Sequence, residues 1–331
     1  MFTQKDLQRL VLPIFLDQLL LAGVGIISTL LLSYAGEAAV SAVSLVEMLN
    51  VLIISLLLAV STGGTVVMAQ IIGSKRLEFA QKAAGQLMVL TLIVAFFFVA
   101  LVLVLGQPIL NLLFGSVDPD VMRAARIYFI ISSLSYPFMA LYNSSASMFR
   151  AMGNSRIPML GSMILNISSV IGFGLAIFIF KTGITGVALA SLTSRVIASL
   201  FLLRLSFNRK LTLSLDKNKL FIWDKALIQR IVHIALPNSI ENGVTQLGRV
   251  FLASIIALFG TAQITANGIV NSLGAFALSY SMALIFASVT VVGQCVGAKE
   301  FEQARLYAKK LMRQGQLVTF GLALLQILLL P

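Results

Sequence analysis

The chain has 331 residues, of which 59% are hydrophobic and only 11% are charged, and its formal net charge is +12. Soluble domains carry roughly 25% charged residues, so the composition excludes an ordinary soluble protein. Runs of roughly 20 apolar residues, each long enough to cross a lipid bilayer, follow one another along the chain.

These apolar runs predict nine membrane-spanning α-helices, because a helix satisfies its own backbone hydrogen bonds within hydrocarbon. Short polar segments with turn-forming residues separate the runs. The predicted helices cover residues 10–34, 41–72, 84–114, 122–148, 158–180, 184–206, 231–259, 263–296 and 307–330. The fold class is therefore all-α, that of a polytopic membrane protein.

Lysine and arginine gather at one set of helix ends, and this set is predicted to be cytoplasmic. Only three basic residues lie at the opposite ends: Arg123, Arg126 and Lys181. The pattern predicts a multi-pass protein of the inner (plasma) membrane with a cytoplasmic N-terminus. Residues 207–225 become a basic cytoplasmic linker between an N-terminal lobe, residues 1–206, and a C-terminal lobe, residues 226–331. The scattered placement excludes a nucleic-acid-binding surface.

The second part of the chain repeats the first at a constant offset of 224 residues. At this offset Pro13 aligns with Pro237, and Gly36 aligns with Gly260. The offset also aligns Val67, Gln70, Gly73, Lys75, Glu78 and Ala80 with Val291, Gln294, Gly297, Lys299, Glu302 and Ala304. The first lobe has an even number of predicted helices, so the repeats are parallel. Only the first three helices of the second copy are present, and we expect the chain to be a fragment.

Three segments resemble one transporter family. Residues 67–73 (VMAQIIG), which recur as residues 291–297 (VVGQCVG), resemble the end of the second helix in each lobe of multidrug and toxic compound extrusion (MATE) transporters. Residues 149–158 (FRAMGNSRIP) resemble the basic loop between their helices four and five, and residues 183–190 (GITGVALA) the start of their helix six. The likeness covers essentially the whole chain.

The resemblance implies two lobes of six helices with a substrate cleft between them. It also implies a secondary antiporter, which exports organic cations or amphiphilic compounds by alternating access while Na⁺ or H⁺ flows inward. The chain departs from the family at two positions. Many bacterial members carry acidic residues where this sequence has Ser28 and Val170.

Two carboxylates occupy matching places in the repeats, since Asp17 follows Pro13 by one turn and Glu241 follows Pro237 in the same way. A charged side chain in the middle of a membrane helix costs roughly 2.5–3.5 kcal/mol, so both should face the bundle interior or a wet cleft. Desolvation favours the neutral carboxyl and a bound cation favours the charged one, so such a group can exchange Na⁺ or a proton for a cationic substrate. Alternatively, each carboxylate only caps a broken helix or pairs with a neighbour.

Three other residues are candidates for cation coupling or substrate binding. Glu47 lies close enough to the outer helix ends that solvation alone could account for it. Arg249, two turns beyond Glu241, could repel a cation, although a structural ion pair is the favoured interpretation. Asn166 belongs to a polar patch that either contacts substrate or bonds a neighbouring helix. Arg195 is expected to extend toward cytoplasmic headgroups.

The sequence contains no metal-ligand cluster, phosphate-binding loop or catalytic constellation, so we expect neither enzymatic activity nor a cofactor. The coupling ion is Na⁺ or H⁺, with a Na⁺ site near Glu241 as one option. The predicted partners are the lipid bilayer and small organic cations or amphiphiles, and the chain is expected to be a monomer.

The rival interpretation is a lipid-linked saccharide flippase, which shares the architecture of the superfamily. A flippase for pyrophosphate-linked lipids needs cationic residues in its cleft, whereas this chain offers acids at the paired positions. Cation export is therefore favoured. A passive channel or a receptor fits poorly with a duplication of whole lobes.

Overall fold

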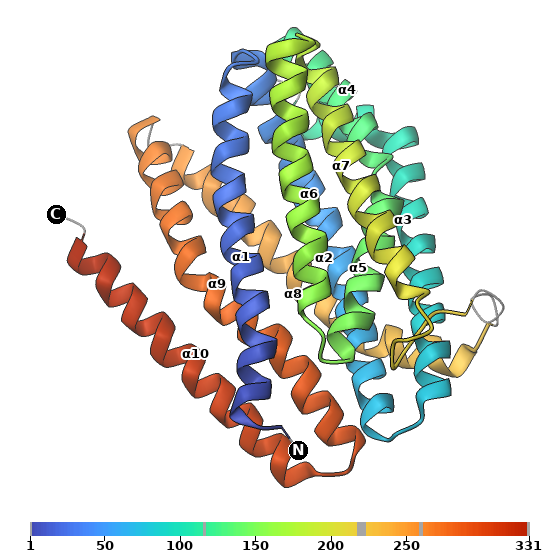
Figure 1. Ribbon diagram of the computed structural model, residues 1–331. Coiled ribbons are helices and arrows are strands. Elements are labelled where there is room, and N and C mark those ends of the chain that lie inside the picture. Colours follow the sequence, from blue (N-terminus) through green and yellow to red (C-terminus); the bar gives the residue numbers. More distant parts are fainter. Residues whose placement is uncertain (1, 115–116, 217–222, 258–260, 330–331) are drawn as a thin grey trace.

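Helices make up nearly all of the chain that the computed structural model describes, which is residues 2–114, 117–216, 223–257 and 261–329. Figure 1 shows an elongated bundle, with the α9–α10 hairpin beside α1. The helices are α1 (Gln4–Ser33), α2 (Glu37–Gly73), α3 (Leu77–Phe114), α4 (Pro119–Ser133), α5 (Tyr136–Ala151), α6 (Arg156–Gly174), the π-helix η1 (Leu175–Ile179), α7 (Gly183–Ser206), α8 (Lys225–Ala257), α9 (Thr261–Gly297) and α10 (Phe301–Leu329).

The repeat predicted from the sequence is visible in the backbone. Helices α2 and α9 each contain 37 residues, and their first and last residues are related by the same offset of 224. The turns that follow them both place a lysine in the left-handed conformation, with φ of 61° at Lys75 and 62° at Lys299. Few non-glycine residues adopt this conformation, so its recurrence at matching positions supports a gapless alignment of the repeats.

One predicted helix, residues 122–148, is two helices in the structure. Helix α4 ends at Ser133, α5 begins at Tyr136, and the pair is bent by 44°. Pro137 lacks a backbone N–H and disfavours helical geometry in the residue before it. The Ser132 and Ser133 hydroxyls also bond carbonyls of their own turn. The described residues thus form ten α-helices instead of nine, and the first lobe has six spans when α4 and α5 count as one.

Helix α1 begins with a capping box at the N-terminal end of the bundle. The Asp6 backbone N–H donates to Thr3 Oγ1 at 3.2 Å, and the Thr3 backbone N–H donates to the Asp6 carboxylate at 2.9 Å. Helix α4 is capped by Asp118, which accepts from the Asp120 backbone N–H at 2.8 Å. These side chains satisfy N–H groups that a helix leaves unpaired in its first turn.

Six described helices are long and apolar enough to cross a membrane, or seven when the bent pair counts as one span. Their outer faces expose large apolar side chains, such as Leu112 at 86% and Val104 at 75%. A surface of this kind suits lipid rather than water. Helix α8 is not among these helices, and Asn238, Glu241 and Arg249 lie along its length.

Buried apolar side chains form two large clusters, one toward each end of the bundle, and one of them also includes Leu227 and Ile231 of α8. We call the end where α1 begins and α2 and α9 finish the basic end, because lysine and arginine gather there. Helix α1 joins the two repeats, since Leu10 and Ile14 pack against Leu284 of α9 and Leu311 of α10. The two copies of the repeat therefore share an extensive contact along α1.

Candidate functional site

Asp17 lies inside the first lobe, where α1 packs against α6. Its side chain is only 8% exposed, although carboxylates are rarely buried without a partner. Ser162 Oγ on α6 donates a hydrogen bond to Asp17 Oδ1. The structure therefore places this residue in the lobe interior, where a carboxylate avoids contact with lipid.

Two side chains of α5 act on the same carboxylate. Tyr142, 7% exposed, and Arg150, 9% exposed, both interact electrostatically with Asp17. The Arg150 guanidinium also lies 4.6 Å from the ring centroid of Phe286 on α9. Its backbone carbonyl accepts a hydrogen bond from Thr290 Oγ1 at 2.9 Å. Arg150 thus connects the surroundings of Asp17 with the second repeat.

Asn166 continues this polar face along α6. It lies one helical turn beyond Ser162, on the same side of the helix, and is 5% exposed. In the described part of the chain its amide nitrogen has no hydrogen-bond partner, and the same holds for Asn143 on α5. A buried donor left unpaired costs about 1–3 kcal/mol, so both amides are suited to bind a polar ligand.

Glu241 and Arg249 lie apart from this site. Both are exposed on α8, and neither side chain has a hydrogen bond to another described residue. The matched acids differ because α6 covers Asp17, whereas no described helix of the second repeat corresponds to α6. A coupling role for Glu241 and a pairing with Arg249 both stay predictions.

Glu47 belongs to a second polar cluster, in the half of the first lobe away from the basic end. Tyr128 of α4 donates to Glu47 Oε1 at 2.8 Å, and the Asn50 amide donates to the same oxygen at 3.0 Å. Asn50 Oδ1 in turn accepts from the Tyr136 hydroxyl at 2.7 Å and from Ser132 at 3.3 Å. These bonds join α2 to both helices of the broken span.

Arg195 completes this cluster from α7. Its Nη1 donates to Ser135 Oγ, in the break between α4 and α5, at 2.6 Å. Its charge also acts on Tyr128 and Tyr136. The prediction that Arg195 extends to headgroups is wrong, because the break supplies a hydroxyl acceptor inside the lobe and the arginine turns toward it.

Helices α2 and α9 meet at the basic end in a nearly two-fold arrangement. A Cβ on Gly73 would overlap the carbonyl oxygen of Gln294, and a Cβ on Gly297 would overlap that of Gln70. The offset of 224 exchanges these two pairs. Gln294 Nε2 also donates to the Ala151 carbonyl at 2.7 Å. Glycine permits this close approach of two backbones, so the contact holds the repeats together at the basic end.

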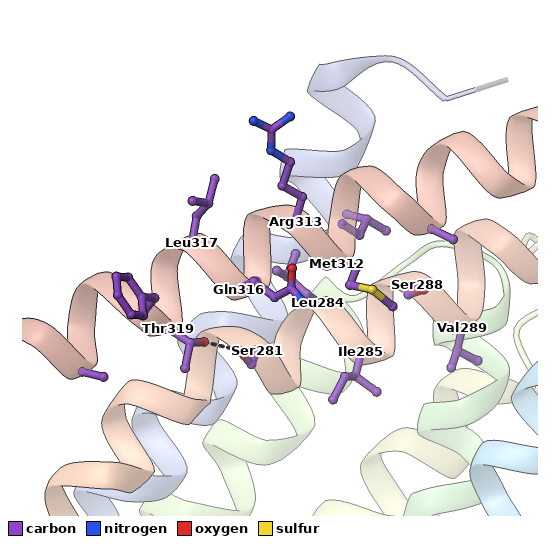
Figure 2. A pocket seen from close by; sticks show the side chains of 15 residues that line it. Ser281, Leu284, Ile285, Ser288, Val289, Met312, Arg313, Gln316, Leu317 and Thr319 are labelled. Carbon is purple, nitrogen blue, oxygen red and sulfur yellow. Dashed lines mark hydrogen bonds between the residues drawn. The ribbon is translucent and has the colours of Figure 1, made fainter.

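An apolar groove of about 970 Å³ runs along the α9–α10 hairpin (Figure 2). Ser281 and Thr319 are hydrogen-bonded across it, and its other lining residues are mostly apolar. Leu311 in this groove corresponds to Leu87 in the first repeat, which is buried in the cluster that includes α5. The groove therefore matches a helix-packing face, and its lining comes from α9 and α10 rather than from the surroundings of Asp17.

Several residues of both clusters were not predicted from the sequence. Ser162 could have been predicted as a site residue from the sequence, because it precedes Asn166 by one turn on the same helix face. No feature of the sequence marked Tyr128, Tyr136 and Asn50 as site residues, since such residues are ordinary in membrane helices. Among the described residues, no group of three or more His, Cys, Asp or Glu side chains could hold a metal ion.

Residues 13–178 and 237–331 match the protein family described as MatE. The chain belongs to the MatE family. Both matched stretches begin at the prolines that the repeat aligns, Pro13 and Pro237. MatE proteins are membrane transporters with two lobes, so the all-α fold with two parallel repeats, predicted from the sequence, is confirmed.

Curated relatives support this assignment. The MatE chain is 25% identical over 299 residues to the uncharacterized transporter YisQ of Bacillus subtilis, covering 88% of this chain and 64% of the relative. It is 26% identical over 278 residues to the probable multidrug resistance protein YoeA of the same organism, covering 82% of this chain and 60% of the relative. The chain thus spans less than two thirds of the length of these relatives.

Solved structures share the fold at lower sequence identity. A mutant of the Vibrio cholerae MATE transporter VcmN superposes with a TM-score of 0.84 at 22% identity, covering 95% of this chain and 71% of that one. A MATE structure in the bent conformation gives a TM-score of 0.85 at 19% identity, with coverages of 96% and 71%. These likenesses establish the fold of the MatE chain.

Proposed function

We propose that this MatE chain exports cationic or amphiphilic compounds in exchange for Na⁺ or H⁺. The observation that carries the proposal is the buried Asp17, to which only Ser162 donates a hydrogen bond among the described residues. A carboxylate in the interior of a membrane protein is a functional group by default, since burying it is costly. The name of YoeA, a probable multidrug resistance protein, supports the substrate class.

Exchange follows from the single carboxylate of this site, Asp17. Burial of a carboxylate is unfavourable, and the Arg150 charge that acts on Asp17 offsets only part of this cost, so Asp17 binds a proton, a Na⁺ or the cation of a substrate. It cannot bind two of these at once, and binding of one therefore releases another. Ser162 orients the charged carboxylate, and the unpaired amide of Asn166 offers a hydrogen bond to a polar group of the substrate.

Antiport also requires alternating access, in which the binding site opens to one side of the membrane at a time. We place the basic end in the cytoplasm, according to the positive-inside rule, with the chain in the plasma membrane as a monomer. The α2–α9 contact then closes the cytoplasmic side, and transport requires the two repeats to separate there. A saccharide flippase is disfavoured because a pyrophosphate lipid would need free positive charge at the site, whereas the Arg150 charge there already acts on the Asp17 carboxylate.

Uptake of ethidium into inside-out vesicles tests this proposal. Asp17→Asn should abolish uptake, because the uncharged amide can neither release a proton nor bind a cation. Asp120→Asn is the matched control, since Asp120 is exposed near the start of α4 and its loss should leave uptake unchanged.

A vesicle gradient of Na⁺ alone or of protons alone should drive uptake and so identify the coupling ion. Full uptake by the Asp17→Asn variant would contradict the assignment of Asp17. Absence of uptake by the unchanged chain under both gradients would contradict the proposed function itself.

A further inference from the structure

A groove in the seam between the two repeats, which we call the α1 groove, lies between α1 and the α9–α10 hairpin and encloses about 340 Å³. Leu7 and Val11 of α1 and Leu284 of α9 are buried and form its apolar floor. Phe15 and Tyr280 form the end away from the basic end, and their rings meet edge to face with centroids 5.4 Å apart. This volume lies within the roughly 300–1,000 Å³ of small-molecule sites, so the groove can hold a flexible apolar chain.

The opposite end of the α1 groove is polar. Lys310 Nζ on α10 donates a hydrogen bond of 2.8 Å to Gln4 Oε1, at the first residue of α1. The Gln8 side chain, one turn further along α1, also lines this end. A lysine ammonium has three N–H donors, and within the described part of the chain Gln4 accepts one of them. Two donors therefore remain for an anion.

The surroundings of this polar end are positively charged. Lys5 and Arg9 are exposed on the same two turns of α1. Asp6, the acid in these turns, accepts hydrogen bonds from the backbone and the hydroxyl of the capping threonine. Glu302 lies on α10 but precedes Lys310 by about 12 Å along the helix. The polar end of the α1 groove is thus complementary to a negatively charged group.

The open side of the α1 groove is apolar. Leu12, which belongs to its lining, is 57% exposed, and Leu16, one turn further along α1, is 43% exposed. Large exposed apolar side chains of this kind suit lipid rather than water. A cationic end beside an apolar floor matches the chemistry of a phospholipid, in which a phosphate is joined to hydrocarbon chains. A free phosphate in water would leave the apolar floor unfilled.

The first repeat shows how the corresponding face is covered. The offset of 224 aligns Lys310 with Gln86, which is buried on α3. Gln86 Oε1 accepts a hydrogen bond of 3.3 Å from the Asp224 backbone N–H, at the end of the linker. Leu213 and Leu215 of the linker are buried in a cluster with residues of α3 and α8. The linker thus covers this face in the first repeat, whereas in the described chain the α1 groove is open and has a lysine in place of the glutamine.

We propose that the α1 groove binds one anionic phospholipid from the bilayer leaflet at the basic end. The lipid phosphate accepts hydrogen bonds from the remaining N–H donors of Lys310, and one acyl chain lies against Leu7, Val11 and Phe15. Helix α1 belongs to the first repeat, and α9 and α10 belong to the second. The lipid therefore contacts both repeats and stabilises the seam between them. This binding does not depend on the proposed transport function.

Native mass spectrometry of the purified chain in detergent tests the charge recognition. Phosphatidylglycerol should remain bound as one molecule per chain, and phosphatidylcholine with the same acyl chains should bind more weakly. Lys310→Gln should lower the affinity for phosphatidylglycerol about tenfold, because the charge-assisted hydrogen bonds to the phosphate are lost while an amide remains beside Gln4. Lys309→Gln is the matched control, since it removes the same charge from an exposed position outside the lining, and it should bind as the unchanged chain does.

A second pair of variants tests the acyl chain. Val11→Phe narrows the α1 groove beside Phe15 and leaves Lys310 in place, so it should also weaken retention of phosphatidylglycerol. Val51→Phe is its control, because Val51 is exposed on α2 and is not part of the groove lining. Glycerol phosphate, which has the anionic group without acyl chains, should not displace the bound lipid.

Three results would overturn the proposal. They are equal binding of the two lipids, equal affinities of the Lys309→Gln and Lys310→Gln variants for phosphatidylglycerol, and undiminished retention in Val11→Phe. Displacement by glycerol phosphate would show that the groove is a site for a soluble anion and would likewise contradict it. Lipid binding is measured without any transport, so failure of this proposal is distinct from failure of the proposed function.

Discussion

At the residue scale, the chemistry of Asp17 is set by side chains that are distant in the sequence. Its hydrogen-bond donor Ser162 is 145 positions away, and Tyr142 and Arg150 come from a third helix. Glu241 has the same local sequence context, with a proline one turn earlier, but it is exposed on α8. The difference between the two acids is therefore a difference in the helices that surround them.

Removal of the Ser162 hydroxyl should strengthen ion binding at Asp17 without unfolding the lobe. A hydrogen bond to a charged group contributes about 1.5–3 kcal/mol and here stabilises the free carboxylate, so Ser162→Ala should raise the apparent affinity for the coupling ion about tenfold. Ser168→Ala is the matched control, because the Ser168 hydroxyl bonds carbonyls of its own helix. Export measured against ion concentration gives both affinities, and equal values for the two variants would exclude a role for Ser162.

At the scale of elements, the helix ends and the break between α4 and α5 follow from local chemistry. Thr3 and Asp6 satisfy each other's backbone N–H groups at the start of α1. The break follows Ser132 and Ser133 and precedes Pro137, whereas the bonds that hold it open come from α2 and α7. Local sequence thus determines where a helix ends, and tertiary contacts determine how the broken pair is held.

Loss of the α1 cap should lower stability by about 1 kcal/mol, the usual cost of replacing a capping threonine by alanine. Thr3→Ala should show this loss in denaturant unfolding of the purified chain in detergent. Thr29→Ala is the control, because the Thr29 hydroxyl bonds only the Gly25 carbonyl within α1. A loss at Thr29 as large as that at Thr3 would contradict a specific role for the cap.

The sequence was sufficient for all helices except the broken pair α4 and α5, and for the repeat and its register, because the periodicity of apolar residues and the turn residues are local properties. The equal lengths of α2 and α9 confirm the register that Gly73 and Gly297 indicated. It was not sufficient for the environments of Asp17 and Arg195. Burial of the first depends on α6, and the orientation of the second depends on a hydroxyl in the break that the sequence analysis had treated as continuous helix.

At the scale of the whole molecule, the contact between α2 and α9 joins the repeats at the basic end. Each helix supplies a glycine that lies against a backbone carbonyl of the other. Arg150 adds a second link, since it interacts with Asp17 and also lies over Phe286 of α9. A change of charge at Asp17 can therefore act on the interface that would open in the proposed alternating access.

A larger side chain at the glycine contact between α2 and α9 should separate the two helices at the basic end. A Cβ on Gly73 or Gly297 would overlap a backbone carbonyl that cannot move away alone. Gly73→Ala and Gly297→Ala should each raise the rate at which a maleimide reaches Cys295, which is fully buried on α9. Gly243→Ala is the control, because a Cβ there meets open space. Equal labelling rates in all three variants would exclude this contact as the closure.

In the proposed function, ion flow and drug export are coupled through the buried carboxylate of Asp17. The most direct measurement of this coupling is ion counterflow in proteoliposomes, in which a gradient of an organic cation is imposed and movement of Na⁺ or H⁺ in the opposite direction is recorded. The unchanged chain should show counterflow, and Asp17→Asn should show none. Counterflow of equal size with that variant would contradict the coupling.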